Sequence, residues 1–303
     1  MLLKVLVVLS SIVLALAAVS RASAEIVVKD ASGVTLTLAA PAKRVVSLAP
    51  HITETLYAAG AGDTVVAAVS YSDYPEAALA LPRVGSYDSI SYESVVAMKP
   101  DLVVAWRSGN GTEAVERLRE LGLTVYVEEP RSLEDVAHSL RLFGVLTGRD
   151  ASAELAAQDY LRELGELRNQ YADQKALSVY YQIWNEPLLT LNGEHLISDV
   201  VRLCGGKNVF AEAIALVTRI SVESVIRADP QVIIASGMDM ARPEWLDDWR
   251  KWDAMTAVAN DQLYFVPPDI LQRHTPRIML GARALCEQMD RARAHYASVA
   301  APQ

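Results

Sequence analysis

The feature that most constrains how this chain can fold is a segment that occurs twice. Residues 91–105 are matched without a gap by residues 221–235, with Ser, Glu, Ser, Val, Pro and Ala recurring in register. Each copy has a serine that can cap a helix, a proline that ends it and an apolar run typical of a buried strand. The repeat predicts two similar α/β lobes, and the interface between two lobes is where small ligands commonly bind.

The rest of the chain alternates between strand-like and helix-like segments. Residues 26–38 alternate in polarity as a hairpin does. Apolar runs typical of buried strands occur at residues 44–48, 64–69, 102–106, 125–127, 177–182 and 263–266. Helix starts are expected at Pro50, Ser91, Ser132, Ser198 and Pro276. Such alternation of strand and helix predicts parallel sheets, and therefore an α/β fold.

One segment breaks this alternation. Residues 150–173 contain no proline, and apolar side chains recur at helical spacing along them. We expect one long helix that joins two pseudo-symmetric lobes, residues 25–149 and residues 174–303. A single helix is a stiff connector, so modest lobe closure is predicted rather than a wide clamp motion.

The first 24 residues have the properties of a secretory signal peptide. Lys4 precedes an apolar stretch, and Ala-Ser-Ala at residues 22–24 is a cleavage signal made of small residues. A retained membrane anchor is the alternative, but the apolar stretch is short for a complete span. We expect a mature chain that begins at Glu25 and resides in a bacterial periplasm.

Charge and motifs narrow the class of function. The net charge is −9, and removal of residues 1–24 makes it more negative because only Lys4 and Arg21 are lost. This argues against nucleic acid or an anionic membrane as a partner. The sequence has no nucleophile elbow, phosphate loop or zinc-protease motif, so an enzyme is not expected.

Cys204 and Cys286 are the only two cysteines. In an exported protein an isolated pair predicts a disulfide, with two buried thiols as the alternative. No histidine lies close to either in the sequence, so a metal site is not expected there. A bond across this loop stabilises the second lobe by about 4 kcal/mol in the chain-entropy treatment.

Several runs give the chain a resemblance to a known family. Arg-Val-Val-Ser-Leu-Ala-Pro at 44–50, Tyr-Ser-Asp-Tyr-Pro at 71–75 and Lys-Pro-Asp-Leu-Val-Val-Ala-Trp at 99–106 resemble the helical-backbone substrate-binding proteins of ABC importers. Within that family, residues 72–75, 105–110 and 204–210 resemble the periplasmic cobalamin (vitamin B12)-binding proteins. The resemblance extends from about residue 43 to residue 287.

The resemblance implies a monomeric binding protein that holds a corrinoid, cobalamin, between its lobes and delivers it to an inner-membrane ABC permease dimer. Cobalamin is then a transported ligand, and no cofactor is expected. Glu93 and Glu223 occupy equivalent places in the repeat, and the resemblance implies that they dock onto arginines of the permease. An acid in the first turn of a helix also complements the helix dipole, and the two roles are compatible.

A large, flat and mostly neutral ligand needs aromatic faces and scattered hydrogen-bond partners rather than a charge clamp. The resemblance implies ligand contacts for Tyr71, Tyr87, Trp106, Asp269 and Arg273. Trp184 and His51 are added because they follow strands, whose carboxyl ends face the cleft. Ile183 and Val217 stand where aromatic residues are expected in the second lobe, and Cys204 and Cys286 match the family's disulfide.

Two other ligands stay open on the same fold. A haem-binding protein is one, because Tyr87 lies near the place where haem-binding relatives carry an iron-ligating tyrosine. An anionic iron-siderophore is the other, but it needs several cleft arginines, and only Arg107 and Arg273 are suitably placed. His51 and His274 lie at turns and can ligate cobalt or haem iron, although a polar contact is the commoner role.

Two further segments carry structural expectations. Residues 107–111 are expected to form a loop that opens Trp106 to the cleft. The acidic segment 239–253 contains Trp245, Trp249 and Trp252 at helical spacing, which predicts one tryptophan face packed on the second lobe. His138, His195 and His295 show no spacing typical of a ligand set.

Overall fold

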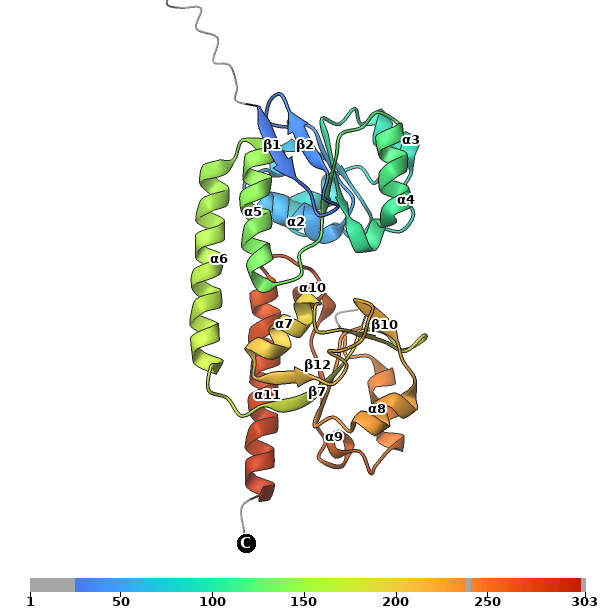
Figure 1. Cartoon of the computed structure of the whole chain (residues 1–303), viewed down its shortest axis with the longest axis vertical. Coiled ribbons are helices and arrows are strands. Elements are labelled where there is room, and N and C mark those ends of the chain that lie inside the picture. The colour runs from blue at the N-terminus through green and yellow to red at the C-terminus, as the bar shows by residue number, and fades with distance from the viewer. Residues whose placement is uncertain (1–24, 238–240, 301–303) are drawn as a thin grey trace, which may run out of the picture.

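A computed structural model describes residues 25–237 and 241–300. The expected signal peptide, residues 1–24, and Asp239 lie outside the described residues. The chain forms two lobes, each built on a four-stranded parallel sheet, and a long helix, α6 (Asp150–Tyr171), runs beside both (Figure 1). The predicted α/β fold with two similar lobes joined by one long helix is confirmed.

The first lobe has a sheet with strand order β4-β3-β5-β6, all parallel. Alternate residues of its strands contact the helices on the two faces, because successive side chains of a strand point to opposite sides. Its elements are β1 (Ile26–Lys29), β2 (Thr35–Leu38), β3 (Val45–Ser47), α2 (Pro50–Ala58), η1 (Gly62–Thr64), β4 (Val65–Ala68), η2 (Glu76–Ala80), α3 (Tyr92–Ala97), β5 (Leu102–Trp106), α4 (Arg107–Glu120), β6 (Val125–Glu128) and α5 (Leu133–Thr147).

The second lobe repeats this plan with strand order β12-β11-β7-β9. Read in reverse, β9, β7, β11 and β12 correspond to β4, β3, β5 and β6. Its elements are β7 (Leu177–Gln182), β8 (Leu189–Leu191), α7 (Leu196–Leu203), β9 (Gly206–Asn208), β10 (Val217–Arg219), α8 (Val222–Ala228), β11 (Val232–Ala235), η3 (Glu244–Lys251), α9 (Thr256–Ala259), β12 (Leu263–Phe265), α10 (Pro268–Leu271) and α11 (Ile278–Ala300).

The sequence repeat corresponds to a structural repeat. Ser91 and Ser221 each cap a helix by accepting the backbone N–H of the serine three residues later. Each copy then turns through a residue with positive φ, 47° at Lys99 and 39° at Asp229. The strands that follow, β5 and β11, belong to different sheets, so the two copies build two separate lobes.

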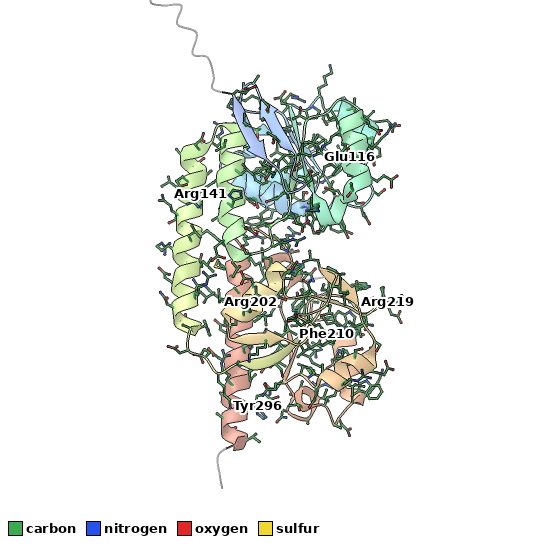
Figure 2. The ribbon with its side chains drawn as sticks, viewed as in Figure 1. Glu116, Arg141, Arg202, Phe210, Arg219 and Tyr296 are labelled. Atoms are coloured by element: carbon green, nitrogen blue, oxygen red, sulfur yellow. A yellow bond between two sulfur atoms is a disulfide. The ribbon has the colours of Figure 1, made fainter. Side chains whose placement is uncertain are left out.

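The connecting helix α6 is anchored along its length. Tyr160, Leu164 and Leu167 bury one face of it, as their spacing predicts. Helix α5, which carries the labelled Arg141, packs beside it (Figure 2). Arg141 makes a bidentate pair with Glu154 of α6, at 2.6 and 2.9 Å. One cluster of buried apolar residues runs from the first lobe through these helices into the second. The connector is therefore part of a continuous core.

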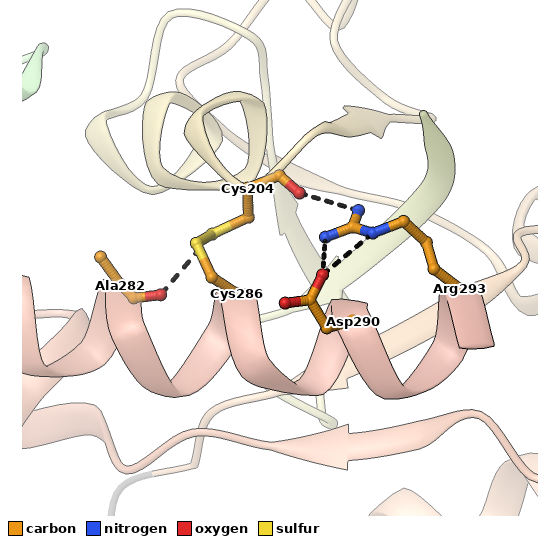
Figure 3. Close-up of a disulfide and its surroundings, with 5 residues drawn as sticks. All are labelled: Cys204, Ala282, Cys286, Asp290 and Arg293. Atoms are coloured by element: carbon orange, nitrogen blue, oxygen red, sulfur yellow. Dashed lines mark hydrogen bonds and ion pairs between the residues drawn. A yellow bond between two sulfur atoms is a disulfide. The ribbon is translucent and has the colours of Figure 1, made fainter. Parts of the chain in front are cut away.

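The predicted disulfide is present. Cys204, at the end of α7, is bonded to Cys286 of α11 (Figure 3). Arg293 of α11 donates to the carbonyl of Cys204 at 3.0 Å and pairs with Asp290 at 2.7 Å. The bond and the arginine together hold α7 against α11.

Three local expectations were wrong. Residues 107–111 begin α4 directly after Trp106, so no loop precedes this helix. Gly111, with φ 78°, kinks the helix. Helix α7 starts after His195, whose ring accepts the N–H of Ile197, so the cap lies before Ser198. The tryptophan segment forms the 3₁₀ helix η3, which has three residues per turn. Trp249 is buried but Trp252 is 44% exposed, so the three rings do not share a face.

No helix in the described part of the chain combines the length and apolarity needed to cross a bilayer.

Candidate functional site

The space between the lobes contains two adjoining cavities of about 230 and 470 Å³. Both are lined by Tyr87, Trp106, Gly237 and Gln272, so they are two parts of one cleft. Strand ends and helix starts of both lobes line it, as expected where parallel strands present their carboxyl ends.

An asparagine fixes the aromatic wall of the first lobe. Asn110 accepts the backbone N–H of Trp106 at 2.6 Å and donates to the carbonyls of Tyr87 at 2.6 Å and Leu48 at 3.0 Å. It thereby joins the ends of β3 and β5 to the loop that carries Tyr87. The rings of Tyr87 and Trp106 lie 5.8 Å apart between centroids as a result.

The glycine before this asparagine makes room for the indole ring. A Cβ atom added at Gly109 would lie 1.9 Å from the ring of Trp106, far closer than any real contact. The Trp-Arg-x-Gly-Asn run thus has a physical role. The glycine lets the ring lie against α4, and the asparagine holds the backbone beneath it.

Tyr71 extends the aromatic wall from a strained position. It adopts φ 63°, which is unfavourable for a residue with a side chain, and it is 69% exposed at the edge of the smaller cavity. Such strain persists only where the surroundings impose it, and it is common at ligand sites. The exposed ring has no packing role that would account for this conformation.

Three histidines meet at the floor of the cleft. The ring of His274 lies 5.7 Å from that of His51 and 5.3 Å from that of His195, between centroids. Burial lowers the pKa of His274 to about 4. Burial also lowers the pKa of His195 to about 3, and the positive charges of Arg131 and of protonated His274 add to this effect. Burial, with the charges of His274 and Arg273, holds the pKa of His51 well below its usual value. All three imidazoles are therefore neutral at neutral pH.

A buried carboxyl group lies behind the floor. Glu128, the last residue of β6, has its Oε2 atom 3.8 Å from Nε2 of His51. Burial raises the pKa of Glu128 to about 7, and the negative charges of Glu129 and Asp135 add to this effect. Glu128 therefore ionises only near neutral pH.

Beside the cleft, charged side chains join the two lobes. Glu54 of α2 accepts hydrogen bonds from Arg277 Nε at 2.6 Å and Arg277 Nη2 at 2.8 Å, and from the hydroxyl of Thr275 at 2.6 Å. The guanidinium of Arg277 also lies 3.8 Å from the ring centroid of Tyr74, a cation–π contact. Because Glu54 is only 2% exposed, water does not screen these bonds.

Arg273 is neutralised at the rim. It pairs with Asp73 of the first lobe at 2.6 Å and with Asp269 of α10 at 3.0 Å. Asp269 and Arg273, for which the resemblance implies ligand contacts, thus pair with each other, and both line the smaller cavity. Arg107, by contrast, donates to the carbonyl of Ala31 and lines a separate hollow near the β1–β2 turn. The expectation that Arg107 faces the cleft was wrong.

The structure places the seven predicted ligand residues on this cleft. They come from both lobes and line one or both cavities: His51, Tyr71, Tyr87, Trp106, Trp184, Asp269 and Arg273. Ile183 and Val217 line the larger cavity, so the second lobe presents an aliphatic wall where aromatic residues were expected.

Sequence reasoning missed His195, Gln272 and Leu216, which also line the cleft. His195 directly follows Asn-Gly-Glu at residues 192–194, and this position could have identified it as a helix cap. The other two have no signal of their own, because only the tertiary fold brings them to the cavity.

Glu93 and Glu223 lie away from the cleft. Both are exposed in the first turns of α3 and α8. Hydrogen bonds with its own backbone and with Ser221 lower the pKa of Glu223. In Figure 1, α3 and α8 lie on the side of the molecule opposite α6. One acid per lobe is thus presented on the same side.

A protein-held metal ion does not fit this site. Within residues 25–237 and 241–300, no group of three or more His, Cys, Asp or Glu side chains is arranged to hold an ion. The cleft instead offers aromatic faces, neutral imidazoles and paired charges. This set suits a large organic ligand without a net charge.

Proteins of similar sequence identify the family of this chain. The family model described as periplasmic binding protein matches residues 45–270. The vitamin B12-binding protein of Vibrio cholerae is 38% identical over 247 residues, covering 81% of this chain and 88% of that protein.

Solved structures give the same picture. The crystal structure of the periplasmic vitamin B12 binding protein of Vibrio cholerae has a TM-score of 0.77 and 37% identity, covering 84% of this chain and 98% of that one. A periplasmic heme-binding protein from Roseiflexus sp. RS-1 has a TM-score of 0.72 at 22% identity, covering 82% and 98%, which shows a shared fold. From the matched family model and these relatives, the chain belongs to the periplasmic binding protein family.

Proposed function

We propose that this protein captures a corrinoid, cobalamin, between its lobes and delivers it to an ABC importer without changing it chemically. The observation that carries the proposal is the make-up of the cleft. Tyr71, Tyr87 and Trp106 form an aromatic wall on one side, and an aliphatic wall with Ile183 and Val217 faces them. A flat, amide-bearing and largely neutral macrocycle matches both walls.

The charges of the cleft support a neutral ligand. Arg273 is paired with Asp73 and Asp269 and is near Glu54 at 3.8 Å, so it adds no free positive charge. Its remaining donors and the carboxylate of Asp269 can bond to carboxamide groups at the rim of the ligand. An anionic iron-siderophore would need unpaired arginines, and Arg107 is turned away. The relatives named vitamin B12-binding proteins support the same ligand class.

Haem is the second candidate, favoured by one observation. The hydroxyl-bearing ring of Tyr87 is 40% exposed and lines both cavities, where it could reach a macrocycle metal. The aliphatic second wall would accept the apolar face of haem as well as that of a corrin. The two ligands therefore have to be separated by experiment.

Calorimetric titration of the purified protein with cyanocobalamin, cobinamide and haemin makes this separation. Saturable binding of the corrinoids with weak or no haemin binding supports the proposal. Tyrosinate–iron absorption bands that vanish in Tyr87→Phe would support haem instead. Asp269→Asn and Arg273→Gln should weaken corrinoid binding, whereas Glu113→Gln on the exposed surface of α4 serves as a control.

We propose the corresponding division of the chain. Residues 1–24 direct export to the periplasm, residues 25–149 and 174–303 form the two lobes, and residues 150–173 connect them. Glu93 and Glu223 dock the loaded, monomeric protein onto arginines of a permease dimer, one lobe to each half. Their equivalent places in the repeat support this, because a two-fold partner requires matched contacts.

A further inference from the structure

The floor of the cleft places a histidine beside a carboxyl group, and the nearer nitrogen of the histidine lacks a hydrogen-bond partner. His51 is 5% exposed and Glu128 is 4% exposed. His51 Nε2 has no hydrogen-bond partner in the described part of the chain, and the hydroxyl of Ser139 is the side-chain donor beside the carboxyl group of Glu128. The 3.8 Å between His51 Nε2 and Glu128 Oε2 is longer than a hydrogen bond. Unpartnered buried polar groups cost free energy, so packing does not explain this pair.

A histidine beside a carboxyl group is a common pairing at metal-ligating histidines, and closing the 3.8 Å gap by a small shift would complete it. A ligating imidazole usually gives its second N–H to a carboxylate, which fixes the tautomer and makes the ring a better donor. In His51, Nε2 is the nitrogen nearer Glu128, so a proton held on Nε2 would point toward the carboxyl group. The lone pair of Nδ1 then remains for a ligand, and the ring lines the smaller cavity.

The surroundings of His51 favour a metal that arrives inside a macrocycle. One imidazole is too little to hold a free ion, and the residues described here offer no three-ligand group. A metal already bound in a macrocycle needs only an axial donor. The ring of Trp106 stands nearly perpendicular to that of His51, at 84° and 5.1 Å between centroids, and lies beside the site such a ligand would occupy.

The ionisation state suits this role. The pKa of His51 is held well below its usual value by burial and by the charges of His274 and Arg273, so the ring is neutral and its lone pair is free. Glu128, His195 and Arg273 are the other titratable groups around the floor. None of them has to change its charge for coordination to occur.

We propose that His51, positioned by Glu128, supplies an axial ligand to the cobalt of the bound corrinoid. The Nδ1 lone pair forms the bond to cobalt, a bound water leaves to solvent, and the Nε2 proton is shared with Glu128. No electron transfer is involved. The cleft therefore favours corrinoids whose lower axial position is not filled by their own base. This inference rests on the proposed corrinoid function and adds a ligand subclass to it.

Visible absorption of aquocobinamide gives the first test. Its bands should shift on binding to the wild-type protein, whereas those of cyanocobalamin, in which base and cyanide fill both axial positions, should stay unchanged. His51→Ala should abolish the shift and weaken cobinamide binding at least about 10-fold, and Glu128→Gln should keep the shift but weaken binding about 10–100-fold. His138→Ala, an exposed site on α5, is the matched control and should behave as wild type.

Electron paramagnetic resonance identifies the donor atom. Reduced cob(II)inamide bound to the protein should show a nitrogen superhyperfine triplet. The triplet should become a doublet when the protein is labelled with nitrogen-15 histidine, and it should be absent in His51→Ala.

The outcomes separate this inference from the proposed function. If cyanocobalamin binds but cobinamide bands do not shift, or shift equally in His51→Ala, the inference is overturned and the corrinoid function stands. Loss of the shift in His274→Ala with retention in His51→Ala would also overturn it, because the ligating ring would be another. If no corrinoid binds, both proposals fall.

Discussion

The carboxylate of Glu54 on α2 accepts hydrogen bonds from both Nε and Nη2 of Arg277, which lies just before α11. These two residues belong to different lobes, and their bond is nearly sealed from water. Removal of one partner from such a pair leaves the other buried and uncompensated. The orientation of the lobes thus depends on this bond as well as on α6.

We therefore expect Glu54→Gln to lower the free energy of unfolding by about 3 kcal/mol. The exposed pair of Arg162 and Glu166 on α6 provides the control, since Arg162→Ala should cost less than about 1 kcal/mol. Urea denaturation measures both. Small-angle scattering of the wild type should change little on ligand binding, whereas Glu54→Gln should give a broader distribution of lobe orientations. A large closure in the wild type would contradict this account.

The contact between Gly109 and Trp106 gives a second prediction. Gly109→Ala places a methyl group where the indole ring lies, so the ring must move and corrinoid affinity should fall about 10-fold, by analogy with a lost aromatic contact. Gly165→Ala in α6, where an added Cβ meets nothing within 4 Å, is the matched control. Calorimetry of both variants decides the matter, and equal affinities would show that the indole position is unimportant.

Tyr71 should show a conflict between stability and binding. Glycine adopts φ 63° without strain, so Tyr71→Gly should stabilise the fold or leave it unchanged, within about 1 kcal/mol. The same change removes an aromatic face and should weaken ligand binding. Thermal unfolding and calorimetry on one sample test both effects. If binding is unaffected, Tyr71 does not belong to the site.

Charge reversal separates docking from capture. Glu93→Lys with Glu223→Lys should leave ligand affinity unchanged, because both side chains lie outside the cleft, but should abolish stimulation of the permease. Glu166→Lys on α6, on the opposite side of the molecule, should have no effect on either. Transport into vesicles that contain the permease is the measurement. Full transport by the double variant would remove these residues from the interface.

The pH dependence of stability should reveal Glu128. Its pKa is about 7 in the fold against 4.5 for an unperturbed carboxyl group, so the folded state holds a proton that the unfolded state has already lost. The stability present below the unfolded pKa is therefore lost as the pH rises through the folded pKa. Relative to wild type, Glu128→Gln should gain about 3 kcal/mol between about pH 4 and about pH 8. A difference that is independent of pH would place the proton elsewhere.

Much of the fold was predictable because it depends on local signals. Serine caps, proline stops and apolar runs gave the two lobes, since each signal acts within a few residues. The place of Trp106 on the cleft was predictable because it ends a strand, and strand ends converge in such sheets. The resemblance added Tyr71, Tyr87, Asp269 and Arg273, which local patterns alone would not have singled out.

The remainder depended on contacts between distant parts of the chain. His195 meets His274 only after two lobe elements pack together, and nothing in either segment indicates the other. Arg107 was misplaced because a kinked helix replaced the expected loop and turned its side chain toward Ala31. The pairing of Glu54 with Arg277 could not be predicted either, because it forms only when the two lobes come together.

The Cys204–Cys286 bond has a consequence for where the protein can mature. Helix α7 begins after His195, which lines the cleft, and ends at Cys204. Helix α11 contains Cys286 and begins beside Arg277, which bonds to Glu54 of the other lobe. A single oxidation step thus fastens together two supports of the cleft between the lobes. A chain kept among reducing thiols would lack that fastening.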